Sequence, residues 1–171
     1  MKKISIIYLF AVIFSIVFSS CTSTEEEEAI VLDIQKMRED YVSGYDWFSF
    51  EYEDYTIKSA YLEDLKNNYD NSIHSFLIYS KPSCSCGPEY RKTAQFIKVL
   101  DSIGVETNNI QLYSVGNNNY SHPYKDKITL NNIPAFIVLK NNVPVYSIND
   151  TIIQYNNARF IEDCLLDALK K

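Results

Sequence analysis

Two cysteines separated by one residue are the side chains of this chain with the clearest capacity for chemistry. Cys84 and Cys86 lie in "KPSCSCGPEY", residues 81–90, and Pro88 follows two residues later. Proline suits the first turn of a helix, so we expect Cys86 at a helix N-terminus. Unpaired backbone N–H groups and the helix dipole stabilise a thiolate there, which lowers the thiol pKa and makes the sulfur nucleophilic.

The second thiol and a nearby carboxylate modify that chemistry. A Cys84–Cys86 disulfide would close across one residue, and good geometry needs α-carbons roughly 5.5 to 6 Å apart, so we expect strain and an oxidising bond. Glu89, in the first helical turn, favours the helix but opposes the thiolate as a like charge. The pair therefore indicates a redox couple or, alternatively, a Cu(I) site, because two soft thiolates suit that ion.

The N-terminus has the pattern of an export signal. Two lysines precede residues 4–18, an apolar run too short for a comfortable membrane span but right for a secretory signal. Two serines then lead into Cys21. Residues 1–20 resemble a bacterial lipoprotein signal, cut before a cysteine that becomes acylated, although Phe18 stands where an aliphatic residue is usual. A plain signal peptide or an anchor helix are the alternatives, and all three place the remaining chain outside the cytoplasm.

A short acidic segment follows the predicted export signal. Residues 21–28 are expected to form a short acidic tether that begins at the predicted lipidation site, Cys21. The glutamate run in this tether also resembles the acidic surface-export signal of Bacteroidetes lipoproteins. The anchor predicts a membrane location on the periplasmic side of the envelope, in the outer membrane or at the cell surface.

A formal net charge of -6 and a pI near 4.9 argue against nucleic acid as a binding partner, because phosphate binding needs clustered basic side chains. Cys164 shares a helix face with apolar residues and is expected to be a buried hydrophobe.

The elements that must position the cysteines follow from hydrophobic spacing. Residues 29–54 are expected as a helical N-terminal extension, with a helix over 29–42 and an aromatic strand over 45–52. Beyond it, the pattern predicts one domain over 55–171. Its expected elements are, in order, a helix ending near 67–71, a buried strand at 75–80, a helix that starts at Pro88 and ends just before Gly104, a strand at 110–115, a short helix near 124–128, a hairpin of 135–140 and 143–148 around Asn141-Asn142, and a C-terminal helix from Ala158 to Leu169.

This order, with "FLIYSKPSCSCGPEY" and "NNIPAFIVLKNNVPVY", resembles the thioredoxin family over roughly residues 55–171. The resemblance implies an α/β fold with a mixed central sheet and helices on both faces. It implies that Cys86 attacks a disulfide and Cys84 resolves the mixed disulfide. It also implies that Pro134 is a cis-proline facing the active-site sulfur and that Ile133 offers backbone groups to substrate.

The chain departs from the family pattern at several positions. Glu89 stands where the family has its second cysteine, Ser83 replaces the tryptophan, and apolar Leu77 or Ile78 replaces a buried acid. Without that acid, proton transfer lacks its usual base, and slow catalysis is expected.

Three functions compete. The first is a membrane-anchored, extracytoplasmic thiol-disulfide oxidoreductase that acts on protein disulfides or dithiols without a cofactor. The second is a Cu(I) chaperone resembling the Sco type, which needs a distant histidine; His74, expected at the surface, and His122, in a loop, do not match its position. The third is a binding module without turnover.

Overall fold

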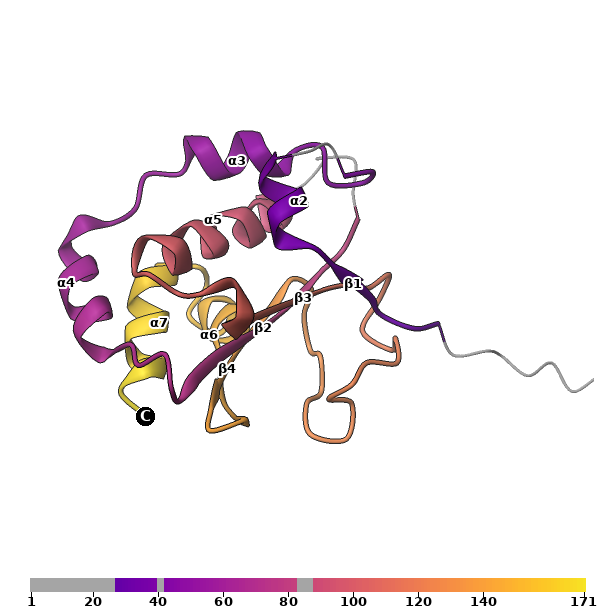
Figure 1. The fold of residues 1–171 in the computed structure, drawn as a ribbon. Helices are drawn as coiled ribbons and strands as arrows, with labels where there is room; N and C mark the ends of the chain where they lie inside the picture. The colour runs from indigo at the N-terminus through magenta and orange to yellow at the C-terminus, as the bar shows by residue number, and fades with distance from the viewer. Residues whose placement is uncertain (1–26, 40–41, 83–87) are drawn as a thin grey trace, which may run out of the picture.

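The computed structural model describes residues 27–39, 42–82 and 88–171 (Figure 1). The lipidation site Cys21 and both cysteines of the pair, Cys84 and Cys86, lie outside the described residues. The elements in chain order are β1 (Ile30–Leu32), α2 (Ile34–Glu39), α3 (Phe48–Asp54), α4 (Ser59–Asn68), β2 (His74–Ser80), α5 (Pro88–Ser102), the 3-10 turn η1 (Thr107–Asn109), β3 (Ile110–Ser114), β4 (Ala135–Lys140), β5 (Val143–Ser147), α6 (Ile148–Gln154) and α7 (Ile161–Leu169).

The five strands form one mixed sheet in the order β1-β3-β2-β4-β5. β2 and β3 run parallel and are connected through α5, whereas β4 pairs antiparallel with β2 and β5 pairs antiparallel with β4. Residues 76–79 of β2 have no exposed surface, as expected for the central strand of a sheet covered on both faces. The α/β class and the mixed central sheet are therefore confirmed.

The two faces of the sheet are covered differently. Alternate β2 residues Phe76 and Ile78 share a core with apolar side chains from all the described α-helices. Leu77 and Tyr79 point to the other face, where they pack with Ile128 and other residues of segment 115–134. In the described part of the chain no helix covers that second face, so the prediction of helices on both faces is wrong.

Within the described residues, the second face of the sheet lacks a helix because the short helix expected near residues 124–128 forms only one turn. The backbone N–H groups of Lys127 and Ile128 both donate to the Tyr124 carbonyl, which closes a single turn that does not propagate. Segment 115–134 runs as loops and turns beside the sheet (Figure 1). Its apolar side chains pack on this face of the sheet.

The N-terminal extension packs into the same core as the rest of the chain. The buried apolar residues of its described part are Ile34, Met37, Tyr45, Trp47 and Phe48. The helix predicted over 29–42 is confirmed only for α2, because Ile30–Leu32 pair antiparallel with β3 and form the edge strand β1. The strand predicted over 45–52 is wrong: Phe48 begins α3, and Phe48 and Glu51, three residues apart on that helix, are both buried.

The turns around the hairpin follow the prediction. Asn141 and Asn142 have φ of 53° and 62°, the left-handed region that a two-residue hairpin turn requires. β5, which contains Pro144, is an edge strand. Ser147 ends β5, and the chain continues as α6, a helix that the apolar pattern did not indicate.

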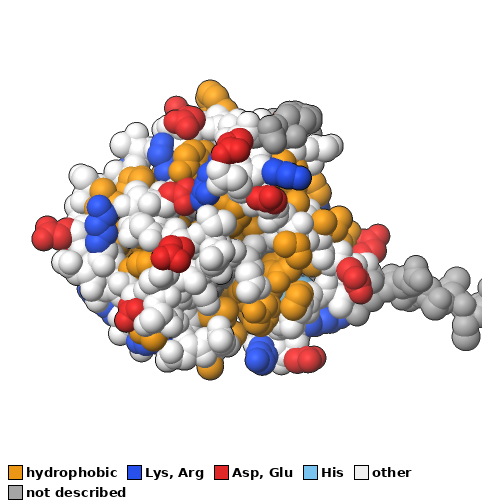
Figure 2. Space-filling view, in the orientation of Figure 1, with side chains coloured by type: hydrophobic (Ala, Val, Ile, Leu, Met, Phe, Trp, Pro, Cys, Tyr) orange, Lys and Arg blue, Asp and Glu red, His pale blue; other side chains and the backbone are white. Residues whose placement is uncertain are grey.

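Charged side chains of both signs are interspersed on the face shown in Figure 2, with apolar side chains between them. None of the helices within 27–39, 42–82 and 88–171 is both long and apolar enough to cross a membrane.

Candidate functional site

The carboxyl ends of the parallel strands β2 and β3 mark the candidate site. β2 ends at Ser80 and α5 begins at Pro88, so the described strand and helix flank the two cysteines in sequence as predicted. β3 ends beside β2, at Ser114, and the Val115 N–H donates to the Ser80 carbonyl over 2.8 Å. Side chains that can act on the cysteines are therefore expected at this edge of the sheet.

Pro134 lies at the same edge. The Ile133-Pro134 peptide bond is cis, as the resemblance implied. Tyr79 of β2 pairs with Ala135 of β4, which brings Pro134, one residue earlier, beside the carboxyl end of β2. Pro134 is buried and Ile133 is half-buried against the core under segment 115–134. The structure therefore brings Ile133 and Pro134 next to the strand end from which the cysteine segment begins.

Buried hydroxyl groups fill the space beneath this edge. Ser80 Oγ lies 3.1 Å from Thr93 Oγ1 of α5, and Tyr45 donates its O–H to Ser114 Oγ over 2.8 Å. All four residues are buried. Burial raises the pKa of Tyr45, against a smaller lowering by its bonds to Ser114 and Ser80, so the phenol stays protonated at neutral pH. This hydroxyl cluster can relay hydrogen bonds but supplies no base.

Carboxylates lie elsewhere. Leu77 and Ile78, where the resemblance would place a buried acid, are completely buried and apolar. The buried acids among the described residues are Glu51 of α3 and Glu162 of α7. Glu51 Oε1 lies 3.0 Å from Arg91 Nε on the second turn of α5. Sequence reasoning missed this pair because it assigned residues 45–52 to a strand; the three-residue spacing from Phe48 to Glu51 was the signal.

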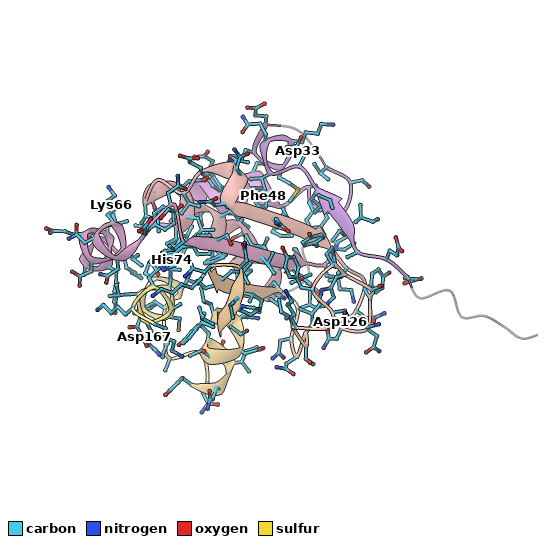
Figure 3. All side chains as sticks on the ribbon, turned by 60° about the horizontal axis from the view of Figure 1, so that its bottom comes forward. Asp33, Phe48, Lys66, His74, Asp126 and Asp167 are labelled. Carbon is cyan, nitrogen blue, oxygen red and sulfur yellow. The ribbon has the colours of Figure 1, made fainter. Side chains whose placement is uncertain are left out.

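His74 is buried, so its prediction as a surface residue is wrong. It lies at the amino end of β2, opposite to the cysteine end, and is 3% exposed (Figure 3). The Asp70 N–H donates to its Nδ1 over 3.0 Å, whereas its buried Nε2 finds no hydrogen-bond partner among the described residues. Burial, with help from the charge of Lys140, lowers the pKa of His74, and Asp70 opposes the shift.

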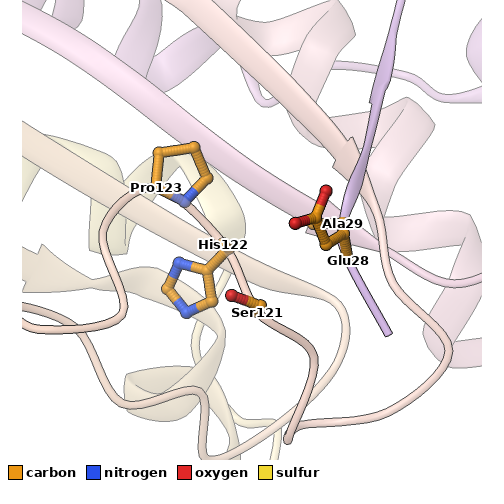
Figure 4. Close-up of a pocket in the computed structure, with 5 residues that line it drawn as sticks. All are labelled: Glu28, Ala29, Ser121, His122 and Pro123. Carbon is orange, nitrogen blue, oxygen red and sulfur yellow. The ribbon is translucent and has the colours of Figure 1, made fainter. Parts of the chain in front are cut away.

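His122 is a buried residue of segment 115–134. Tyr79 Oη and His122 Nδ1 lie 3.0 Å apart and form a buried hydrogen bond, and burial raises the pKa of Tyr79 so that the phenol stays protonated. Burial lowers the pKa of His122, which keeps the imidazole neutral. A pocket of about 290 Å³ lies beside it; its two sides are lined by Glu28 and Ala29 and by Ser121, His122 and Pro123 (Figure 4).

The other thiol and the metal-binding side chains complete the inventory. Cys164 is free and buried as predicted, and burial raises its pKa to about 11, which makes it a poor nucleophile. In the part of the chain that the structure describes, no three His, Cys, Asp or Glu side chains lie close enough to hold a metal ion.

The described geometry therefore assembles one edge at which Ile133, Pro134, the hydroxyl cluster and the start of α5 meet. Comparison of the chain with protein-family models, with curated proteins and with solved structures found no match.

Proposed function

We propose that this chain is a thiol-disulfide oxidoreductase of thioredoxin-like fold that works outside the cytoplasm, anchored to a membrane through Cys21. The observation that carries the proposal is the position of Pro134. It lies beside the carboxyl end of β2, the strand that leads into Cys84 and Cys86, and α5 begins directly after them. A substrate backbone bound along Ile133 and Pro134 would therefore lie next to the cysteine segment.

The topology supports the same assignment. A parallel pair, β2 and β3, is joined through the helix that follows the cysteines, and the β4–β5 hairpin and a C-terminal helix come after it. That is the order on which the resemblance to the thioredoxin family rests.

The reaction needs only the two thiols. The Cys86 thiolate attacks one sulfur of a substrate disulfide, forming a mixed disulfide and expelling the other substrate sulfur as a thiolate, which takes a proton from solvent. The Cys84 thiolate then attacks Cys86 Sγ, which releases the second substrate thiolate and leaves the Cys84–Cys86 disulfide. Two electrons pass to the substrate, and an external dithiol must restore the reduced protein. Backbone N–H groups at a helix N-terminus would lower the pKa of the Cys86 thiol and favour its thiolate.

Single-cysteine variants test this function. We expect the reduced protein to cleave insulin disulfides, Cys86→Ser to abolish turnover, and Cys84→Ser to accumulate a mixed disulfide with substrate. Cys164→Ser is the matched control, because it removes a thiol that is buried and has a raised pKa.

Two results would contradict the proposal. One is the absence of insulin cleavage together with alkylation of Cys84 and Cys86 no faster than that of a model thiol. The other is tight Cu(I) binding by the reduced protein without any turnover, which would favour the copper-binding alternative.

A further inference from the structure

The carboxylate of Asp150 accepts hydrogen bonds from the segment that precedes Pro134. Asp150, in the first turn of α6, accepts from Asn132 Nδ2 over 2.7 Å, from Asn131 Nδ2 over 3.2 Å and from Ser147 Oγ over 2.8 Å. Hydrogen bonds to an ionised acceptor are stronger than neutral ones. Asp150 therefore fixes two consecutive side chains of the segment immediately before Ile133 and Pro134.

The neighbouring residue holds Pro134 itself. Asn149 is 1% exposed, and its Nδ2 donates to the Pro134 carbonyl over 2.5 Å. Its Oδ1 accepts from Lys92 Nζ over 3.4 Å, and the same ammonium lies 3.2 Å from Asn157 Oδ1. Lys92 belongs to α5, the helix that follows the cysteines. Asn149 thus connects the cysteine helix to the backbone of residue 134.

We propose that Asn149 and Asp150 are positioning residues that hold the backbone of residues 131–134 in the conformation that binds a protein disulfide substrate. The proposal rests on the proposed function. It names the side chains that position the segment to which the substrate would bind. Residues 131–134 precede β4 outside regular secondary structure, and Asn131 is exposed. An irregular segment that is ordered before binding spares the substrate the entropic cost of ordering it.

Loss of the Asp150 carboxylate should weaken binding of a protein substrate without changing the reactivity of the thiol. Asp150 is half-buried at the surface of α6, so its loss leaves the core in place. A substrate that binds along residues 131–134 should lose affinity, whereas a small alkylating reagent that meets only the thiol should react as before. A residue needed merely for stability would not separate these two readouts.

The test compares Asp150→Ala with wild-type protein at full length. Turnover is measured with insulin as substrate and an excess of an external dithiol as reductant, and the alkylation rate is measured separately on the reduced protein with iodoacetamide. We expect the KM for insulin to rise about tenfold, which corresponds to about 1.4 kcal/mol, while kcat and the alkylation rate change less than twofold. Asp150→Asn keeps one acceptor oxygen and should recover most of the affinity. Asp126→Ala is the matched control, since Asp126 is an exposed carboxylate on a turn of segment 115–134 (Figure 3).

A double-mutant cycle adds a readout at the bond itself. Asn132→Ala combined with Asp150→Ala should raise KM no further than Asp150→Ala alone, because the Asn132 side chain acts through its hydrogen bond to Asp150.

The outcomes separate the two proposals. If wild-type protein cleaves insulin and Asp150→Ala behaves like Asp126→Ala, the positioning role is refuted and the oxidoreductase function stands. If Asp150→Ala lowers kcat and alkylation rate together with the melting temperature, its role is structural and the inference is also overturned. If wild-type protein cleaves no disulfide, the proposed function falls, and the inference falls with it.

Discussion

Buried histidines predict how the stability of this protein depends on pH. His74 and His122 are 3% and 8% exposed, and burial is the largest cause that lowers each pKa. In the unfolded chain both imidazoles titrate near the ordinary value of about 6.5. Below that pH the unfolded state therefore binds protons that the folded state does not. The stability contributed by the neutral imidazoles is complete above pH 6.5 and is lost as the pH falls towards their folded pKa values.

The magnitude follows from the number of protons. One extra proton bound by the unfolded state changes the free energy of unfolding by up to about 1.4 kcal/mol per pH unit. Two histidines acting together give a limiting slope of about 2.7 kcal/mol per pH unit below pH 6.5. The pKa of Asp70 is lowered by its hydrogen bonds to Ser72, so that carboxyl titrates below this window.

Urea denaturation between pH 7.5 and pH 5.5 measures this slope. We expect His74→Gln and His122→Gln each to remove part of the acid-induced loss, and the double variant to remove more of it than either single variant. Wild-type stability that is flat from pH 7.5 to 5.5 would refute the reasoning, as would a double variant that keeps the full slope.

Three further substitutions and one control test the hydrogen bonds and the core packing. Glu162→Ala leaves the half-buried Tyr55 O–H and the Lys58 backbone N–H without their buried acceptor, so the free energy of unfolding should fall by about 3 kcal/mol in urea titrations; an unchanged midpoint would show that those bonds are absent. Phe48→Ala should cost about 3 to 5 kcal/mol by the same assay, whereas Phe50→Ala, 70% exposed, should change stability by less than about 0.5 kcal/mol; equal effects would contradict the packing of α3. Asn149→Leu removes the donor to the Pro134 carbonyl and should lower stability by about 1 to 3 kcal/mol, and a variant as stable as wild type would argue against that bond.

Local patterns predicted the part of the fold that surrounds the candidate site. The continuous apolar runs of β2 and β4 have one explanation, burial on both faces of a sheet, and the Asn141-Asn142 pair has the backbone preference that a tight hairpin requires. Pro88 likewise begins α5 at the predicted residue. In each case the local preference and the tertiary structure agree.

The N-terminal extension and the second sheet face depended on distant contacts instead. Ile30–Leu32 have helical spacing with α2, but pairing with β3 gives them strand hydrogen bonds. Phe48 and Glu51 lie on one face of a helix that the alternating aromatic residues concealed. His74 was expected at the surface because it is polar and precedes a strand, yet the Asp70 N–H and the ring of Tyr69, 6.1 Å away, enclose it. No spacing rule shows such contacts between segments.

The redox state of the Cys84/Cys86 pair is the most direct test of the central claim. The wild-type protein should be equilibrated in buffers of known thiol-disulfide potential, quenched by alkylation, and analysed by peptide mass. We expect one reversible two-electron transition between the dithiol and a Cys84–Cys86 disulfide. Its potential should lie above that of thioredoxin, about -270 mV, because the disulfide spans a single residue. Two cysteines that remain unpaired thiols at every potential would contradict it.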